Sequence, residues 1–282
     1  MAGIWEKALA GRWIAGPSIR DAMALSKKFN AKNISTILNY LGEELTDREK
    51  ISKAVSTYAA LLEEIKMNKI SASISLKPTQ LGLSLSYKLF EANYARILSM
   101  ARSRHIFVWL DMEGPGYISS TIRAYIGNMR GAGDSGICIQ ANMKRSAADI
   151  KRIAGRNGVI RLVKGAYSGS AGQCYESKEE VDDNFIKLLK YIFMHSDMFM
   201  VATHDTSMIE LSKRLNIKYK KNVTYAMLNG VRNKLAVSLT RTDKVSVYVP
   251  FGPEWVAYSI RRLKEAGHLG IILKSLLENQ GI

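Results

Sequence analysis

Short apolar runs alternate with longer amphipathic stretches along the chain, and this alternation repeats eight times. Most of the short runs are dense in β-branched or large apolar residues, which is typical of strands buried on both faces. We therefore predict eight strands, at Ile34–Leu41, Ile70–Lys77, Ile106–Asp111, Gly136–Ala141, Val159–Lys164, Phe199–Thr203, Val223–Leu228 and Val245–Val249.

Helical patterns separate these strands, and two of them begin with a recognisable capping sequence. Thr46–Glu49 has the spacing of a capping box that opens a helix to about Asn68, and Ser177–Glu180 opens another helix to about His195. Residues 1–30 are rich in helix formers and predict a helical lead-in before the first strand.

The repeated strand and helix units predict the fold. No Pro/Gly-rich linker or change in composition interrupts them, which favours one closed parallel barrel over an open doubly wound sheet. We therefore expect an α/β fold of the (βα)8 TIM type in a single domain over residues 1–282, with the helical lead-in packed on the barrel.

Active sites of such barrels lie at the carboxyl ends of the strands. Six of the eight predicted strands carry polar or ionisable residues there, although strand ends that meet solvent are often polar for structural reasons alone. The residues at this edge are Lys77, Asp111 with Glu113, Gln140, Lys164, His204 with Asp205, and Tyr248.

Composition and charge narrow the class of protein. The 47% hydrophobic content excludes a disordered chain, and two cysteines exclude a disulfide scaffold. The net charge of +16 fits nucleic acid, an anionic membrane surface or a small anionic ligand. The densest basic cluster, Lys218, Lys220 and Lys221, is best interpreted as a solvated connector, and no nucleic-acid-binding motif occurs.

The sequence shows neither a signal peptide nor an apolar run of the ~18 residues that span a bilayer. We therefore expect a cytoplasmic protein whose membrane contact, if any, is peripheral.

Two segments carry the most specific chemistry. On a helix after Pro253, the residues Tyr258, Arg261, Arg262 and Glu265 share one side, where two guanidinium groups suit a carboxylate; an exposed Arg261–Glu265 ion pair is the alternative. Arg161 stands inside an apolar strand, where its charge requires an anionic ligand, a carboxylate such as Asp111, or both.

Other kinds of site are disfavoured. His204 lacks a second histidine at metal-ligand spacing, and no G-x-S-x-G nucleophile elbow occurs, so we expect neither a metal site nor a hydrolase. Gly131–Gly136 matches G-x-G-x-x-G but precedes a strand, so we interpret it as a loop and not as a dinucleotide fingerprint.

Taken together, the blocks at the strand ends resemble the proline dehydrogenase family, flavin-dependent (βα)8 barrels that oxidise L-proline to Δ1-pyrroline-5-carboxylate. The matching blocks keep the order of the family along nearly the whole chain. They are SISLKPTQLG (73–82), WLDMEG (109–114), GICIQANMKRS (136–146), RLVKGAY (161–167), ATHD (202–205) and YVPFGPEWVAYSIRRLKE (248–265).

The resemblance implies roles for individual residues and places the last helix over the barrel mouth. It implies that Arg261 and Arg262, with Lys77, hold the proline carboxylate, and that Asp111, Tyr248 and Tyr258 line the same pocket. It also implies that Arg161 lies near the flavin N5. The residues implied to contact FAD are Met112, Gln140, Arg161, Lys164, Gly165, Ala166, Thr203, His204 and Glu265.

Three departures from the family pattern affect the expected cofactor and substrate contacts. Ala226 stands where Gln is usual, Asp205 where Asn is common, and the segment after Tyr167 is small and Gly-rich instead of acidic. Preference for proline over hydroxyproline therefore stays open.

Two rival functions and several partners also remain open. The rivals are another flavin barrel, similar to methylenetetrahydrofolate reductase, and a non-catalytic basic barrel that binds nucleic acid or a membrane. For the expected enzyme, the acceptor is a quinone at the inner face of the cell membrane or a redox partner protein, and a homo-oligomer is compatible with the sequence.

Overall fold

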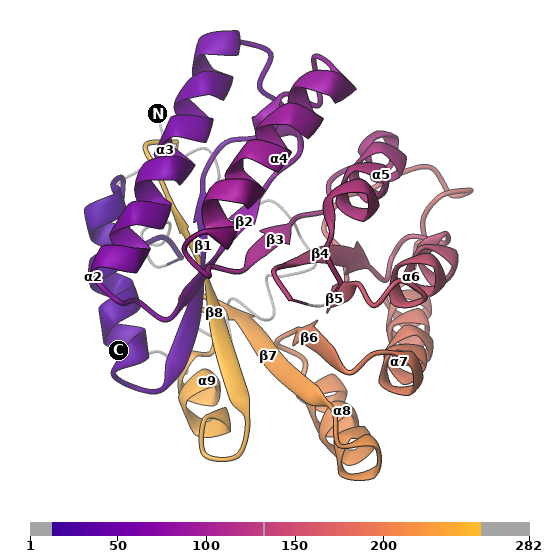
Figure 1. Ribbon diagram of the computed structural model, residues 1–282. Helices are drawn as coiled ribbons and strands as arrows, with labels where there is room; N and C mark the ends of the chain where they lie inside the picture. The colour runs from indigo at the N-terminus through magenta and orange to yellow at the C-terminus, as the bar shows by residue number, and fades with distance from the viewer. Residues whose placement is uncertain (1–12, 132, 255–282) are drawn as a thin grey trace, which may run out of the picture.

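The computed structural model describes residues 13–131 and 133–254, which contain a closed barrel of eight parallel strands in sequential order. Figure 1 looks into the ring of strands, with the helices around its outside. The predicted barrel fold is therefore confirmed. The strands are β1 (Ile34–Tyr40), β2 (Ala72–Leu76), β3 (Val108–Leu110), β4 (Ser135–Gln140), β5 (Val159–Val163), β6 (Met198–Ala202), β7 (Asn222–Leu228) and β8 (Lys244–Phe251).

A helix follows each of the first seven strands, and α2 precedes the first. The α-helices are α2 (Ile19–Asn30), α3 (Arg48–Met67), α4 (Tyr87–Arg102), α5 (Ile118–Asn128), α6 (Ser146–Ala154), α7 (Lys178–His195), α8 (Thr206–Tyr219) and α9 (Asn233–Leu239). Two 3-10 helices, η1 (Thr79–Leu81) and η2 (Pro115–Tyr117), lie in the connections after β2 and β3.

The lead-in helix is confirmed for α2, which begins at a capping box formed by Ser18 and Asp21. Residues 1–12 of the predicted lead-in lie outside the described residues, as does the helix expected over the barrel mouth, which falls within 255–282. The boundaries of the single predicted domain therefore stay a prediction.

Two details of the predicted elements are wrong. The helix α3 is capped by Asp47 and not by Thr46, because the Asp47 carboxylate accepts the backbone N–H groups of Glu49 and Lys50. The capping box predicted for α7 is confirmed, with Ser177 and Glu180 reciprocally bonded.

The second error concerns β8, which continues to Phe251 instead of ending at Val249. Its end is held between two neighbours: Tyr40 of β1 pairs with Phe251, and the Ala15 N–H donates to the Pro250 carbonyl at 2.9 Å. Tyr248 therefore lies inside the strand and not at its end.

The Gly-rich segment is a connection before β4 at residues 131, 133 and 134, as predicted, whereas Gly136 already belongs to β4. The predicted basic connector is only partly a loop, since Lys218 belongs to the last turn of α8 while Lys220 is its left-handed cap. Lys218 and Lys220 are exposed, which agrees with a solvated position.

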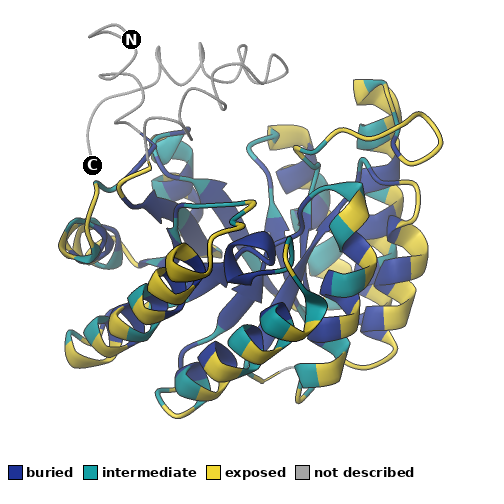
Figure 2. Ribbon diagram, turned by 90° about the horizontal axis from the view of Figure 1, so that it is seen from above, coloured by how far each residue is buried: buried dark blue, intermediate teal, exposed yellow. Residues whose placement is uncertain are grey.

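Side chains alternate along the strands between two apolar regions. The larger region lies between the barrel and the helices, whose outer faces are exposed (Figure 2). The smaller region fills the barrel interior and includes Ile37, Trp109, Val159, Met200 and Ala226. Within residues 13–131 and 133–254, no helix is both long and apolar enough to cross a bilayer.

Candidate active site

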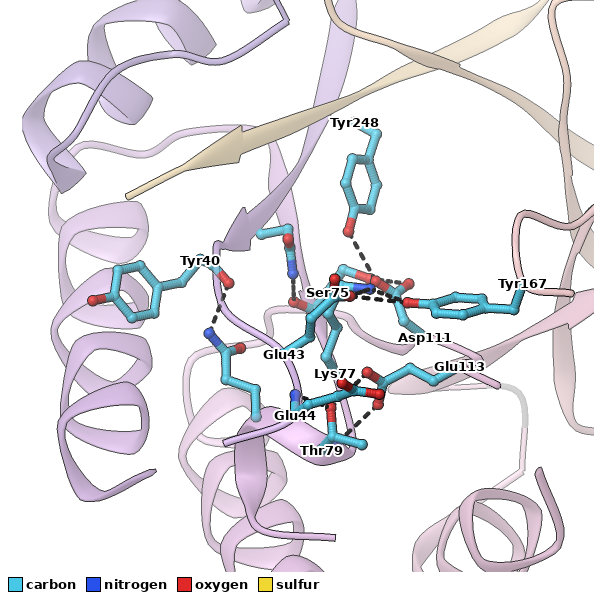
Figure 3. Close-up of polar contacts among 12 residues, drawn as sticks. Tyr40, Glu43, Glu44, Ser75, Lys77, Thr79, Asp111, Glu113, Tyr167 and Tyr248 are labelled. Atoms are coloured by element: carbon cyan, nitrogen blue, oxygen red, sulfur yellow. Dashed lines mark hydrogen bonds and ion pairs between the residues drawn. The ribbon is translucent and has the colours of Figure 1, made fainter. Parts of the chain in front are cut away.

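Asp111, the first residue after β3, is the centre of a buried polar cluster at the carboxyl ends of the strands (Figure 3). One carboxylate oxygen accepts hydrogen bonds from Arg161 and from the Ser75 hydroxyl, the latter at 2.7 Å. The other oxygen accepts from the Tyr248 hydroxyl at 2.8 Å. Side chains from β2, β5 and β8 therefore converge on the carboxylate that follows β3.

The protein keeps Asp111 ionised. Burial alone raises the pKa of this carboxyl group, but the charges of Arg161 and Lys77 and the hydrogen bonds from Ser75 and Tyr248 lower it further than burial raises it. The net pKa is below its ordinary value. Burial lowers and the Asp111 charge raises the pKa of Arg161, and the net pKa lies above its ordinary value. The two side chains form a buried ion pair at neutral pH.

Arg161 has hydrogen-bonding capacity beyond this pair. Its guanidinium carbon lies 5.1 Å from the centre of the Trp109 ring and 5.5 Å from that of Tyr248. Its Nε and Nη1 are buried without an oxygen or nitrogen acceptor within the described residues, and the Cys138 thiol beside the guanidinium is a weak acceptor. Unpaired buried donors are costly, so these two nitrogens indicate a ligand that accepts hydrogen bonds at this position.

Lys77 follows β2 and lies in a second polar group (Figure 3). Its ammonium donates to the Tyr167 hydroxyl at 3.0 Å and lies 3.4 Å from a Glu43 carboxylate oxygen. Burial lowers the pKa of Lys77, but Tyr167 and the nearby carboxylates raise it to well above its ordinary value. Lys77 is therefore a fixed positive charge at the mouth.

Glu113 and Gln140 fix the backbone at the mouth through hydrogen bonds. The Glu113 carboxylate accepts the Thr79 backbone N–H at 2.8 Å and the Thr79 hydroxyl at 2.6 Å, which anchors η1 (Figure 3). Burial raises the pKa of Glu113, partly offset by Lys77 and Thr79. The Gln140 amide donates to the Glu113 carbonyl at 3.0 Å. Because these bonds fix backbone, Glu113 is a structural anchor of the site.

Lys164 lies on the far side of the mouth and is paired with two carboxylates. It contacts Asp182 of α7 and Asp205, the latter at 2.7 Å. Asp205 also caps α8 through the Ser207 N–H. Burial raises the pKa of Asp205, but the bonds to Lys164 and Ser207 lower it further, to about 2. Lys164 is thus positioned by residues that the sequence did not assign to it.

Thr203 and His204 follow β6. The His204 Nε2 accepts the Leu228 backbone N–H at 3.1 Å, and the His204 carbonyl accepts a bond from Arg232 at 2.7 Å. This geometry requires the proton of neutral His204 to reside on Nδ1. Thr203 is buried, and its hydroxyl accepts the Asp205 N–H at 3.1 Å.

The backbone after β5 is shaped by Gly165, whose φ of +111° is rarely adopted by other residues. A Cβ at this position would lie 2.0 Å from the Asn142 Oδ1, an oxygen that is itself buried without a hydrogen bond in the described residues. Ala166, next in the chain, is exposed, and Met112, which follows Asp111, is buried. Only glycine leaves space for close approach here.

Four of the predicted site residues lie outside the described residues: Tyr258, Arg261, Arg262 and Glu265. The carboxylate-binding pair predicted from the helix after Pro253 therefore stays a prediction. Of the other predicted residues, Lys77, Asp111, Arg161 and Tyr248 lie in one connected cluster, whereas Lys164 and His204 lie on the β5 to β7 side.

Comparison with known proteins shows which family these residues belong to. The family model described as proline dehydrogenase matches residues 22–269. The chain belongs to the proline dehydrogenase family. "Proline dehydrogenase 1" of Bacillus subtilis subsp. natto is 30% identical over 274 residues, which cover 95% of this chain and 91% of the relative. "Proline dehydrogenase" of Deinococcus radiodurans is 30% identical over 267 residues, covering 91% of this chain and 86% of the relative. The family is one of oxidoreductases.

A solved structure of proline utilization A from Bdellovibrio bacteriovorus superposes with a TM-score of 0.82 over 91% of this chain. The one from Bradyrhizobium japonicum, solved as a variant, gives 0.80 over 94%. The sequence identities of 19% and 17% are low, so these likenesses show the fold alone. The chain spans about a third of the length of those proteins, with a coverage of 32% for each.

Several members of the candidate site that the fold brings together were not predicted from the sequence. Ser75 bonds to Asp111, and Tyr167 with Glu43 holds Lys77. A signal existed for Ser75, because it stands two residues before Lys77 and so shares its inward face. For Glu43 and Asp182 there was none, because each reaches the mouth from a different part of the chain.

Proposed function

We propose that the protein oxidises L-proline to Δ1-pyrroline-5-carboxylate with FAD, the first step of proline catabolism. Membership of the proline dehydrogenase family supports proline as the substrate. The observation that carries the proposal at this site is Arg161, a buried cation with two unpaired donors at the carboxyl ends of the strands.

The described residues fit a flavin. Its ring edge presents hydrogen-bond acceptors, and the Nε and Nη1 of Arg161 are donors without a partner among the described residues. The glycine at 165 removes the side chain that would obstruct a planar ring. When bound, FAD would supply a two-electron acceptor for the hydride that leaves proline C5, while the amine nitrogen releases its proton to solvent as the C5–N double bond forms. In the proposal, Met112, Gln140, Lys164, Ala166, Thr203, His204 and Glu265 complete the cofactor contacts.

The positive charges of the mouth then act on two anions. Lys77, which Tyr167 and Glu43 hold in place, contributes one cation to the proline carboxylate, with Arg261, Arg262 and Tyr258 supplied by the helix outside the described residues. Arg161 stabilises negative charge that develops on the cofactor side. Asp111 orients Arg161, and the Tyr248 hydroxyl holds Asp111 through its other oxygen, so that the pair is fixed before substrate arrives.

Electrons must leave the site for a second acceptor. A quinone and a redox partner protein remain the two proposed acceptors, with peripheral membrane contact and a homo-oligomer as further proposals for the same protein.

The test begins with the purified full chain reconstituted with FAD. We expect a flavin absorption band that bleaches when L-proline is added without oxygen. Lys77→Met should raise the KM for proline by about tenfold or more with flavin binding unchanged, because it removes a carboxylate contact. Lys221→Met, which removes a surface lysine paired with Asp197, is the matched control. Failure to bind flavin, or a flavin that proline does not reduce, would contradict the proposed function.

A further inference from the structure

The barrel has an open depression at the end opposite the mouth. Two adjoining cavities of about 380 and 250 Å³ open between the amino ends of the strands. They share Ser35, Ser71 and Thr224 in their walls, so they form one continuous two-chambered site, which we call the basal cavity.

Small residues create the inner chamber. Barrels of this type are usually filled by bulky branched side chains, but the lowest interior positions here include Ser35, Ser73, Thr224 and Ser246. At Gly136 a Cβ would lie 2.4 Å from the Trp109 ring, so this position leaves room for the indole and not for a side chain of its own.

The inner chamber has two unlike walls. The hydroxyl residues Ser35, Ser73, Thr224 and Ser246 come from neighbouring strands β1, β2, β7 and β8. Opposite them, Trp109 lies in β3, Phe107 directly precedes it, and Met198 and Met200 come from β6. The Phe107 ring is partly exposed and lies 4.9 Å from the ring of the buried Trp109, so Phe107 presents most of the aromatic surface. Such a chamber suits a planar apolar ring with a polar edge.

The hydroxyl wall prefers a hydrogen-bond donor. Ser35, Ser73 and Ser246 donate to backbone carbonyls at 3.2, 3.4 and 3.3 Å, respectively. With their protons engaged, these hydroxyls offer lone pairs to the chamber. A phenolic O–H on the ring of a ligand is a matching group.

The charged residue that lines the basal cavity lies in the outer chamber. Lys244, exposed at the rim, is the cation among the described lining residues, and none of those residues is Asp or Glu. Its ammonium donates to the Asn222 side chain at 2.8 Å, which holds it at the start of β8. A ligand group placed here is attracted if it is an anion, and the chain's net charge of +16 adds to that attraction.

We propose that the basal cavity binds a small aromatic carboxylate that carries a ring hydroxyl. The ring lies against Phe107, the hydroxyl donates to the serine wall, and the carboxylate lies beside Lys244. None of these residues touches Asp111, Lys77 or Lys164 in the described hydrogen bonds and ion pairs, and the Trp109 ring borders both sites, since it also lies 5.1 Å from the Arg161 guanidinium carbon.

Isothermal titration of the full chain with 4-hydroxyphenylacetate tests the proposal, with 4-hydroxyphenylacetamide as the uncharged probe. We expect saturable binding of one equivalent of the acid and binding of the amide that is about tenfold weaker or more, the effect of about 1.4 kcal/mol of charge attraction. Lys244→Ala should weaken the acid to the level of the amide and leave the amide unchanged.

A variant that fills the cavity provides the second part of the test. Ser73→Leu should abolish binding of both probes, whereas Ser56→Leu, on the exposed face of α3, should not. If Ser73→Leu fails to fold by circular dichroism, the Lys244 variant decides alone, since its side chain is exposed. Three results would overturn the proposal: no binding at millimolar probe, equal affinity for acid and amide, or unchanged affinity for the acid in the Ser73 or Lys244 variant. The last result would mean that the acid binds at the mouth.

Discussion

At the carboxyl ends of the strands Asp111 accepts hydrogen bonds from three side chains, whereas at the amino ends the serine hydroxyls reach only backbone carbonyls. Ser75 and Ser73 of β2 show the difference within one strand. Ser75 donates to Asp111 at 2.7 Å, and Ser73 donates to the Thr36 carbonyl at 3.4 Å and borders the basal cavity.

The two ends of the barrel therefore differ in how their polar side chains are held. At the mouth, burial makes each charge costly, so each is held by partners that would be hard to remove singly. At the base, small side chains leave space, and the hydroxyls lose little if their weak bonds are broken. Stability and preorganisation therefore depend on the mouth, and tolerance to substitution should increase toward the base.

The largest expected effect comes from breaking the central ion pair. Asp111→Ala leaves Arg161 buried without its counter-charge and should lower the free energy of unfolding by about 3–5 kcal/mol. Urea unfolding followed by circular dichroism measures the change. The double variant Asp111→Ala/Arg161→Met should cost less than the sum of the two single variants, because neither charge is then left unpaired. Additive costs would show that the two residues are not coupled.

A smaller effect separates the two serines of β2. Ser75→Ala removes a bond to a charged acceptor and should cost about 1.5–3 kcal/mol, whereas Ser73→Ala should stay within about 0.5 kcal/mol of the parent. Equilibrium unfolding of the two variants side by side gives the comparison directly. Equal costs would mean that the two ends of the strand do not differ as their contacts indicate.

The smallest effect depends on pH. The pKa of Asp205, lowered from 3.8 to about 2, means that its ionised form stabilises the fold above pH 4, and that this contribution is lost as the pH falls from about 4 to 2. Asp205→Asn keeps a capping side chain and weakens the pair with Lys164, so we expect a loss of about 1 kcal/mol at pH 7 that shrinks toward pH 3.

Asp197 offers the control at the base. It precedes β6, pairs with Lys221 at 2.7 Å, and its side chain is 96% exposed. Thermal unfolding of Asp197→Asn should be close to that of the parent at every pH, because exposed ion pairs contribute little. A pH-dependent loss for Asp197→Asn as large as that for Asp205→Asn would remove the distinction between mouth and base.

The elements of the fold could be predicted because their signals are local. Apolar runs such as those of β1 and β5 match the observed strands to within a residue or so, and the Ser177 cap was found from spacing alone. The Thr46 cap was wrong because Asp47, one residue later, offers an equally suitable acceptor, and the choice depends on where the chain turns into α3. The end of β8 was missed because its partners come from β1 and from residue 15.

The site could be predicted only where its residues stand at strand ends. Lys77, Asp111 and Gln140 were found in this way, and Arg161 was found because a charge in an apolar strand requires a partner. The sequence could not decide whether Arg161 pairs with an anionic ligand or with Asp111. In the fold Arg161 donates to Asp111, and two of its nitrogens remain for a ligand.

By itself the sequence determined the eight strands, the polar residues at their carboxyl ends and the resemblance to the proline dehydrogenase family. Hydrophobic periodicity and short sequence motifs depend only on residues that are neighbours in the chain. Only the tertiary structure decided that Glu43 and Tyr167 hold Lys77, that Asp182 holds Lys164, and that serine and threonine residues of four strands line a depression at the base. Closing the barrel brings residues distant in the chain within hydrogen-bonding distance, and no local pattern encodes which of them will meet.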